Sequence, residues 1–90
     1  MRIRWTPSAA ADLEEISNYL KDRHPSYWRP TVLKLYDGVR SLKNFPDAGR
    51  PGREPGTREL LFLPLPYITV YRVKDQVIEV LRIHHAARNV

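Results

Sequence analysis

The chain has 90 residues, no cysteine and a formal net charge of +5 at pH 7. This length fits one domain, residues 1–90, and the lack of cysteine excludes disulfides, thiolate metal sites and cysteine nucleophiles. No apolar run is long enough to cross a membrane, and the first residues lack the apolar core of a signal peptide, so we expect a cytoplasmic protein. The positive charge suits a nucleic acid or an acidic protein as partner, although many small domains are basic for solubility alone.

The first predicted elements are a short strand over residues 1–5 and a helix directly after it. Thr6 is placed as the N-cap and Pro7 at the first helical position, where the missing N–H group costs nothing. The helix is expected to end near residues 23–24, because Pro25 disfavours a helical conformation in the residue before it. Apolar residues recur along this helix at steps of three and four and form one stripe: Ala9, Leu13, Ile16 and Leu20.

A second amphipathic helix follows, and its start is ambiguous in the sequence. Ser26 could cap it, but Pro30 would then lie several residues inside the helix, so a start near Arg29 is an equal alternative. The helix is expected to end around residues 44–45, before Pro46. Its apolar stripe has the same helical spacing as the first: Val32, Leu35, Val39 and Leu42.

The second half of the chain is predicted to be a loop followed by strands. Residues 46–56 hold three prolines and three glycines, which excludes a regular element there. Strands are expected over 57–63, 67–73 and 77–84, with a turn at 74–76 and a short tail or helical turn after them. The order β-α-α-β-β-β predicts an α+β fold in which a helical hairpin packs on one face of a small antiparallel sheet. The uncovered face is then the expected working surface.

Short motifs stand in a fixed order along almost the whole chain: Trp5, Ala10, Asp12-Leu13, Phe45-Pro46, Gly49-Arg50, residues 56–60, Pro66, the strand 67–73, the run 78–83, His85 and Arg88. Their order and spacing resemble the RelE/ParE superfamily, the toxins of type II toxin–antitoxin systems. The match is closest to the ParE branch. The resemblance implies the same fold order, no cofactor, and a cognate antitoxin of the ParD or RelB kind with an acidic C-terminal segment.

The superfamily has two functions on one fold, so the site must decide between them. RelE-like members cut mRNA on the ribosome, whereas ParE-like members bind DNA gyrase. The ribonucleases carry an arginine directly after the position of Tyr67, where this chain has Ile68, and their relatives carry lysines where it has Glu59 and Leu61. We therefore predict a gyrase inhibitor. The alternatives are a ribosome-dependent mRNA endonuclease and a degenerate toxin that binds only its antitoxin.

Basic side chains of the strands are the candidate contacts to the target: Arg58, Arg72, Arg82, His84, His85 and Arg88. If the protein is a ribonuclease, Arg58, Arg82 and His85 are the candidates for catalysis. Neighbouring strand residues point to opposite faces, so His84 and His85 are not expected to act on one substrate atom. Glu79 is a possible partner for Arg72 across the sheet. No metal site is expected, because no third ligand stands at a suitable spacing.

The antitoxin is expected to be disordered alone and to fold on contact. We predict that it forms an amphipathic helix along the helical hairpin, followed by an extended stretch beside the sheet. The candidate contacts are Leu13, Tyr27, Trp28 and Leu35. Trp28 either anchors the partner or only covers a loop.

Overall fold

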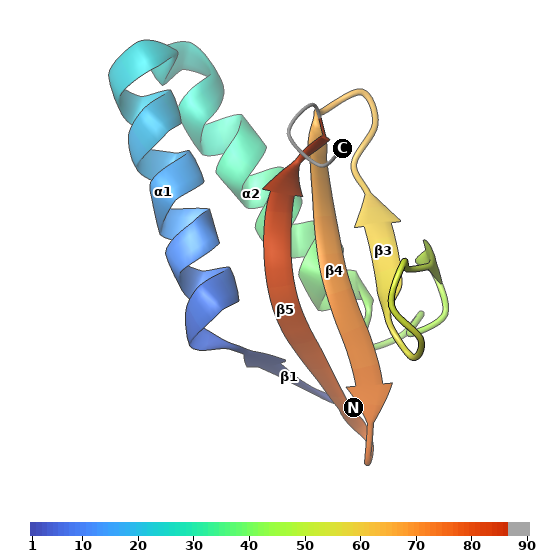
Figure 1. The fold of residues 1–90 in the computed structure, drawn as a ribbon. Coiled ribbons are helices and arrows are strands. Elements are labelled where there is room, and N and C mark those ends of the chain that lie inside the picture. Colours follow the sequence, from blue (N-terminus) through green and yellow to red (C-terminus); the bar gives the residue numbers. More distant parts are fainter. Residues whose placement is uncertain (87–90) are drawn as a thin grey trace.

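The computed structural model describes residues 1–86 of the chain. Two helices form one layer and a five-stranded sheet forms the other, so both helices cover the same face of the sheet (Figure 1). The elements in chain order are β1 (Arg2–Trp5), α1 (Pro7–Arg23), α2 (Pro25–Ser41), β2 (Arg50–Pro51), β3 (Arg58–Leu61), β4 (Tyr67–Lys74) and β5 (Val77–His85). The predicted α+β class and the helical hairpin are confirmed.

The sheet has the order β1-β5-β4-β3-β2 and is mixed. β1 pairs with β5 in parallel, with Ile3 opposite Ile78, and the other pairs are antiparallel. The prediction of a purely antiparallel sheet was therefore wrong. The helical hairpin returns the chain to the end of the sheet from which it left, and a helical connection of this kind allows parallel pairing. The prediction of no regular element in residues 46–56 was also wrong, because β2 pairs with β3 there over two residues.

The helix boundaries follow the predictions for α1 more closely than for α2. Thr6 caps α1, and its hydroxyl accepts a hydrogen bond of 3.2 Å from the backbone N–H of Ala9. α2 begins at Pro25, earlier than both alternatives considered, because proline is tolerated in a first helical turn. Pro30 lies inside this helix. α2 ends at Ser41, before the predicted end, and the chain continues through a turn with i to i+3 hydrogen bonds.

The core lies between the helices and the covered face of the sheet. Leu35 packs with Tyr67 and Ile83, and Leu42 packs with Tyr71. Both tyrosines are buried and pack in the core. All seven leucine, isoleucine and valine residues predicted for the helical stripes are buried or partly buried: Leu13, Ile16, Leu20, Val32, Leu35, Val39 and Leu42.

A turn joins β4 to β5 within the predicted residues 74–76, but it has only two residues, because Lys74 belongs to β4. Asp75 and Gln76 both have positive φ, 52° and 65°, which is the backbone of the tight turns that match the twist of a hairpin. The register then shifts at Val70/Tyr71, where Val70 lies opposite Arg82 and Tyr71 lies opposite Val80. The extra residue of β5 at this bulge is Leu81. The bulge keeps apolar side chains of β5 on the covered face at both ends of the strand.

Candidate functional site

Charged side chains lie side by side on the uncovered face of the sheet. Arg4, Glu79 and Arg72 are in register on β1, β5 and β4. Arg72 Nε donates a hydrogen bond of 2.6 Å to Glu79 Oε1, and Arg4 pairs with the other carboxylate oxygen. These two hydrogen bonds lower the pKa of Glu79, and the one from Arg4 has the larger effect. The predicted pairing of Arg72 with Glu79 is confirmed, and Arg72 is thereby part of a structural cluster.

A second ion pair lies at the other side of this face. Arg50 of β2 donates a hydrogen bond of 3.0 Å from Nε to Glu59 Oε1, and its Nη2 lies 2.9 Å from the same oxygen. The neighbouring Arg58 donates through Nη1 to the carbonyl of Gly49 at 2.7 Å, and its other terminal nitrogen lies 3.5 Å from the carboxylate of Asp47. Both arginines therefore hold the loop of residues 46–56 against β3.

Arg82 is turned toward α1 at the edge of the sheet. Its Nε and Nη2 donate to the two carboxylate oxygens of Asp12, at 2.7 and 3.1 Å. Asp12 also accepts the backbone N–H of Ile83 at 2.9 Å. Burial raises the pKa of Asp12, but the hydrogen bonds from Arg82 and from the Ile83 backbone outweigh it and leave the pKa lowered. β1 no longer pairs with β5 at this point, so the Asp12 carboxylate takes the place of a strand partner.

The two histidines at the end of β5 point to different sides of the sheet. The ring of His85 meets the ring of Tyr67 edge-on, with centroids 5.5 Å apart, on the side that the helices cover. His84 lies opposite Ile68 in register and borders a hollow of about 250 Å³ on the uncovered side. Both histidines also border a hollow of about 320 Å³ between α1 and the edge of β5. The predicted opposite orientation is found along the strand, but both side chains reach this edge.

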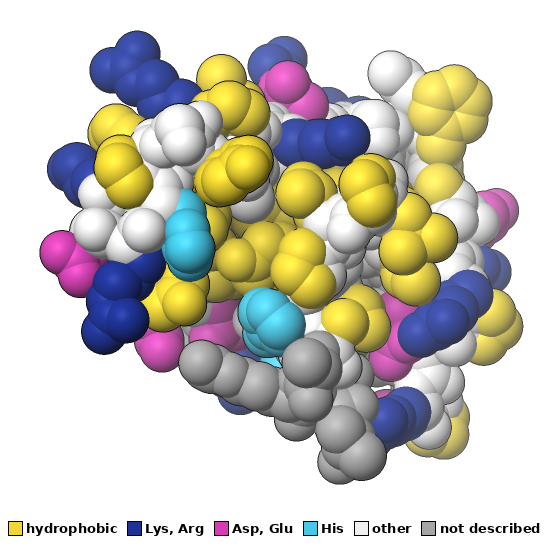
Figure 2. Space-filling view, turned by 90° about the horizontal axis from the view of Figure 1, so that it is seen from above, with side chains coloured by type: hydrophobic (Ala, Val, Ile, Leu, Met, Phe, Trp, Pro, Cys, Tyr) yellow, Lys and Arg dark blue, Asp and Glu magenta, His cyan; other side chains and the backbone are white. Residues whose placement is uncertain are grey.

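Apolar side chains gather around a hollow at the end of the molecule where β5 finishes, and histidines lie at its rim (Figure 2). This hollow measures about 390 Å³ and is lined by aromatic and imidazole rings together with apolar residues. The rings belong to Tyr19, His24, Tyr27, Tyr67 and His85. His85 therefore lines this hollow from the helix-covered side of the sheet.

Ile68 occupies the middle strand of the sheet and is buried. It points to the uncovered face, and its neighbours in register there are Leu61 of β3 and His84 of β5. The positions where the ribonuclease branch would carry cations are thus filled by two apolar residues and by Glu59, which is already paired with Arg50. Within residues 1–86, no group of three or more His, Asp or Glu side chains could hold a metal ion.

The predicted antitoxin contacts are not equivalent in the structure. Leu35 has no exposed surface, so a partner cannot contact it in this conformation, and its assignment as a contact is corrected to a core role. Leu13 is partly buried and lines an open groove of about 410 Å³ beside Trp5 and Val32. Tyr27 is exposed. Trp28 is held to α1 by a hydrogen bond of 2.8 Å from its indole N–H to Ser17 Oγ.

Of the predicted target contacts, Arg88 lies outside the described residues. The others are placed on different parts of the sheet rather than around one point: Arg58, Arg72, Arg82, His84 and His85. The roles of Asp12, Arg4 and Arg50 were not predicted from the sequence. Two features of the sequence could have indicated these roles. Glu59 and Glu79 stand on predicted strands near arginines of other strands, and Asp12 stands beside the apolar stripe of the first helix.

A helical hairpin that packs on one face of a small sheet is the arrangement shared with the solved ParDE and RelBE2 structures. Residues 3–90 match the family described as the ParE toxin of the type II toxin–antitoxin system parDE. The chain therefore belongs to the ParE toxin family, and the predicted resemblance is confirmed. None of the helices in the described part of the chain is long and apolar enough to cross a lipid bilayer.

Individual relatives from both branches are similar to this chain. The candidate toxin Y4kP of Sinorhizobium fredii is 40% identical over 94% of this chain and 88% of its own length. Toxin RelE2 of Caulobacter vibrioides is 36% identical over 97% of both chains. A solved structure of the chromosomal ParDE TA system from P. aeruginosa superposes with a TM-score of 0.84 and 33% identity, covering 94% of this chain and 95% of that chain.

Proposed function

We propose that this toxin inhibits DNA gyrase by binding and does not cleave RNA, and that a cognate antitoxin neutralises it. The observation that carries the proposal is Ile68, a buried apolar residue on the middle strand where a ribonuclease of this superfamily needs a cation. An isoleucine cannot neutralise the charge that develops on a phosphate during cleavage. Loss of one such charge contact costs about 3–4 kcal/mol of transition-state stabilisation.

The contacts of the arginines support the same proposal. Cleavage by the 2′-hydroxyl of RNA requires a base, a cation on the phosphate and an acid for the leaving oxygen. Arg82 is engaged in a bidentate pair with Asp12, Arg72 is paired with Glu79, and Arg58 holds the loop. A phosphate would have to compete with these existing carboxylate and carbonyl contacts. Binding a folded protein makes no such demand on one atomic position.

The family match and the ParDE structure at 33% identity support an antitoxin partner. The net charge of +5 suits an acidic segment that folds on contact. Titration of this toxin with the acidic product of the neighbouring gene should give a stable complex. Added salt should slow association more than it weakens the final affinity. No binding in this titration would remove the antitoxin from the proposal.

The second candidate is a ribosome-dependent mRNA endonuclease, and it is favoured by the 36% identity to a toxin named RelE2. One experiment separates the two. The purified toxin is incubated with gyrase and relaxed plasmid and, in parallel, with programmed ribosomes that carry mRNA. We expect inhibited supercoiling and intact mRNA. Cleavage of ribosome-bound mRNA that is lost in His85→Ala would establish the second candidate instead. The absence of both supercoiling inhibition and mRNA cleavage would indicate a toxin that only binds its antitoxin.

A further inference from the structure

Aromatic side chains gather at the end of the molecule where α1 meets α2. α1 ends at Arg23 and α2 begins at Pro25, so His24 alone joins the two helices. The ring of His24 lies beside two tyrosine rings, with its centroid 6.0 Å from that of Tyr19 and 6.4 Å from that of Tyr27. Both tyrosines are exposed, Tyr19 by 51% and Tyr27 by 64%, and His24 is exposed as well. The three rings therefore form a cluster that is open to solvent.

This ring cluster forms the helical side of the hollow of about 390 Å³ at the end of β5. Tyr67 and His85 form the strand side, and apolar side chains lie between the two sides (Figure 2). Hollows of about 300–1,000 Å³ with mainly apolar walls and a few polar groups are typical ligand sites. Tyrosine and imidazole rings can stack on the faces of a planar group, and their polar atoms can hydrogen-bond to its edges. The hollow is thus suited to a flat heteroaromatic ring such as a nucleobase.

Arg23 is the cation on the α1 side of the hollow. Its guanidinium lies over the ring of Tyr19, with 5.9 Å between the guanidinium carbon and the ring centroid. Its Nε lies 3.4 Å from a carboxylate oxygen of the neighbouring Asp22, and these two side chains are 68% and 79% exposed. An ion pair as exposed as this one contributes little free energy. Arg23 can therefore turn to a phosphate at low cost.

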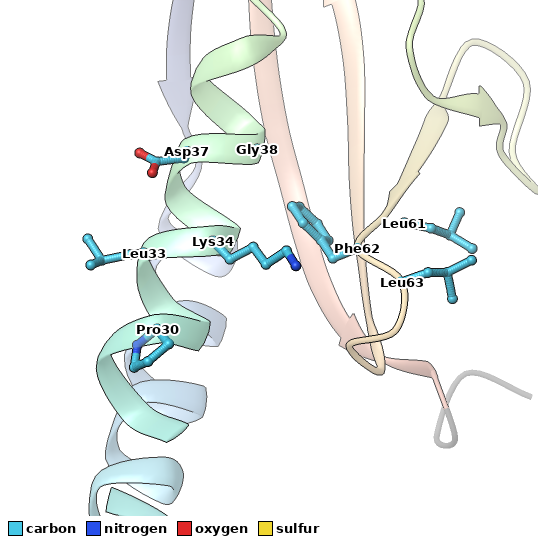
Figure 3. Close-up of a pocket in the computed structure, with 8 residues that line it drawn as sticks. All are labelled: Pro30, Leu33, Lys34, Asp37, Gly38, Leu61, Phe62 and Leu63. Carbon is cyan, nitrogen blue, oxygen red and sulfur yellow. The ribbon is translucent and has the colours of Figure 1, made fainter. Parts of the chain in front are cut away.

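Lys34 is the cation on the α2 side of the hollow. Tyr27, Thr31 and Lys34 follow one another at steps of four and three residues, so they share one face of the helix. Figure 3 shows Lys34 extending toward Phe62 in an open groove of about 620 Å³ between α2 and the end of β3. This groove begins at Pro30, next to Thr31 of the hollow. Lys34 is exposed and forms no ion pair within residues 1–86, whereas the arginines that line the uncovered face of the sheet are engaged.

Rings around an apolar hollow, with cations on both sides of it, match the way in which proteins bind single strands of nucleic acid. Bases stack on aromatic side chains, and Lys and Arg side chains contact the phosphates. We propose that this end of the toxin binds single-stranded nucleic acid. One base occupies the hollow between the ring cluster and the strand side, and the adjoining phosphates contact Arg23 and Lys34.

Two other polyanions fit these observations less well. An acidic protein segment would pair with the cations but would leave the rings without a planar partner. A duplex keeps its bases stacked inside the helix, so it could not place one in the hollow without unpairing it. The site lies on the helix-covered side, away from Ile68 and the uncovered face. Binding here requires no chemistry at a phosphate, so the inference goes beyond the proposed function and does not depend on it.

The test is a fluorescence-anisotropy titration of short labelled strands with the purified toxin at low salt. Oligothymidine is the DNA probe, and oligouridine of equal length is the RNA probe. The matched control is an abasic strand of the same length, which keeps the phosphates but has no bases. We expect at least one of the two probes to bind about fivefold or more tightly than the abasic strand, the effect of one stacked base. Equal binding of all three strands would overturn the proposal, because the site would then recognise charge alone.

Two pairs of variants locate the site. Tyr27→Ala should weaken binding about fivefold or more, whereas Tyr36→Ala, an exposed tyrosine of α2 that lines the groove beside α1, should leave it unchanged. Lys34→Gln should reduce the slope of log affinity against log salt by about 0.7, the value for one phosphate contact of a single strand. Lys43→Gln, beyond the opposite end of α2, should not change this slope.

Circular dichroism checks that each variant is folded. Equal losses for the two tyrosine variants, or equal slopes for the two lysine variants, would contradict binding in the hollow. The titration contains no gyrase, ribosome or antitoxin. A negative result would therefore overturn this inference alone and leave the proposed function standing.

Discussion

The two faces of one sheet are built from different chemistry in this toxin. On β4, Tyr67 and Tyr71 point to the helices and are buried, whereas Val70 and Arg72 point away from them. The covered face is stabilised mainly by apolar packing, and the uncovered face is organised by ion pairs. The arginines of the uncovered face are therefore not unpaired cations that would bind any polyanion. Its arginines already hold neighbouring strands and a loop, and a partner has to fit around those contacts.

The largest effect should come from the covered face. Leu35→Ala removes a side chain with no exposed surface from the cluster with Tyr67 and Ile83. We expect the free energy of unfolding to fall by about 2–5 kcal/mol, measured by chemical denaturation. Leu63→Ala, on a residue that is 76% exposed, is the matched control and should change it by less than about 0.5 kcal/mol. Equal losses in the two variants would mean that Leu35 does not lie in the core.

The covered face could be predicted from the sequence because burial imposes a period on the residues. The burial of Leu35, Val39 and Leu42 could be predicted from this period, and so could the ends of β1, β3, β4 and β5 to within two residues. The strand with which β1 pairs could not be predicted in this way. The pairing of β1 with β5 joins residues more than seventy positions apart, and an alternating strand of four residues fits any open edge of a sheet.

The site was less predictable, because polar side chains on a solvated face have no required period. The Arg72–Glu79 pair could be predicted, since a short hairpin sets its register. The Arg82–Asp12 pair could not, because it depends on where α1 crosses the edge of β5. Leu35 was wrongly predicted to contact the antitoxin, because an apolar stripe on a helix does not show whether the sheet or a partner protein covers it.

The next largest effect is expected where the buried Tyr71 of the covered face binds the loop of residues 46–56. The Tyr71 hydroxyl accepts the N–H of Gly49 at 2.9 Å and donates to the carbonyl of Pro46 at 2.7 Å. Tyr71→Phe keeps the ring in the core but leaves the buried Gly49 N–H without its acceptor. The free energy of unfolding should fall by about 1–3 kcal/mol. Amide exchange at Gly49 should accelerate as well. Unchanged exchange there would show that the loop is held independently of Tyr71.

A smaller effect is expected at the edge between the two faces. Asp12→Asn keeps the size of the side chain but removes the charge that Arg82 and the Ile83 N–H share. The loss should be about 1–2 kcal/mol at neutral pH, moderated by the exposure of Arg82. Because the pKa of Asp12 is lowered by folding from its ordinary value of 3.8, its contribution is present above that value and is lost as the pH falls below it. The stabilities of the unmodified chain and of Asp12→Asn should therefore converge as the pH falls below 3.8 and through the lowered pKa of the folded state. A constant difference across acid pH would contradict this account.

The smallest effect should lie on the uncovered face. Arg72→Gln removes one of the two cations at Glu79, and Arg4 remains to pair with the carboxylate. We expect a smaller shift in the midpoint of denaturation than for Asp12→Asn. The double change of Arg4 and Arg72 should exceed the sum of the single ones, because only then is Glu79 left unpaired. At about 1 M salt, where the Debye length is about 3 Å, the single-variant shift should shrink further, whereas the effect of Leu35→Ala should persist. If the single change of Arg72 matches the effect of Leu35→Ala, the uncovered face carries the stability of the fold and the contrast between the faces is wrong.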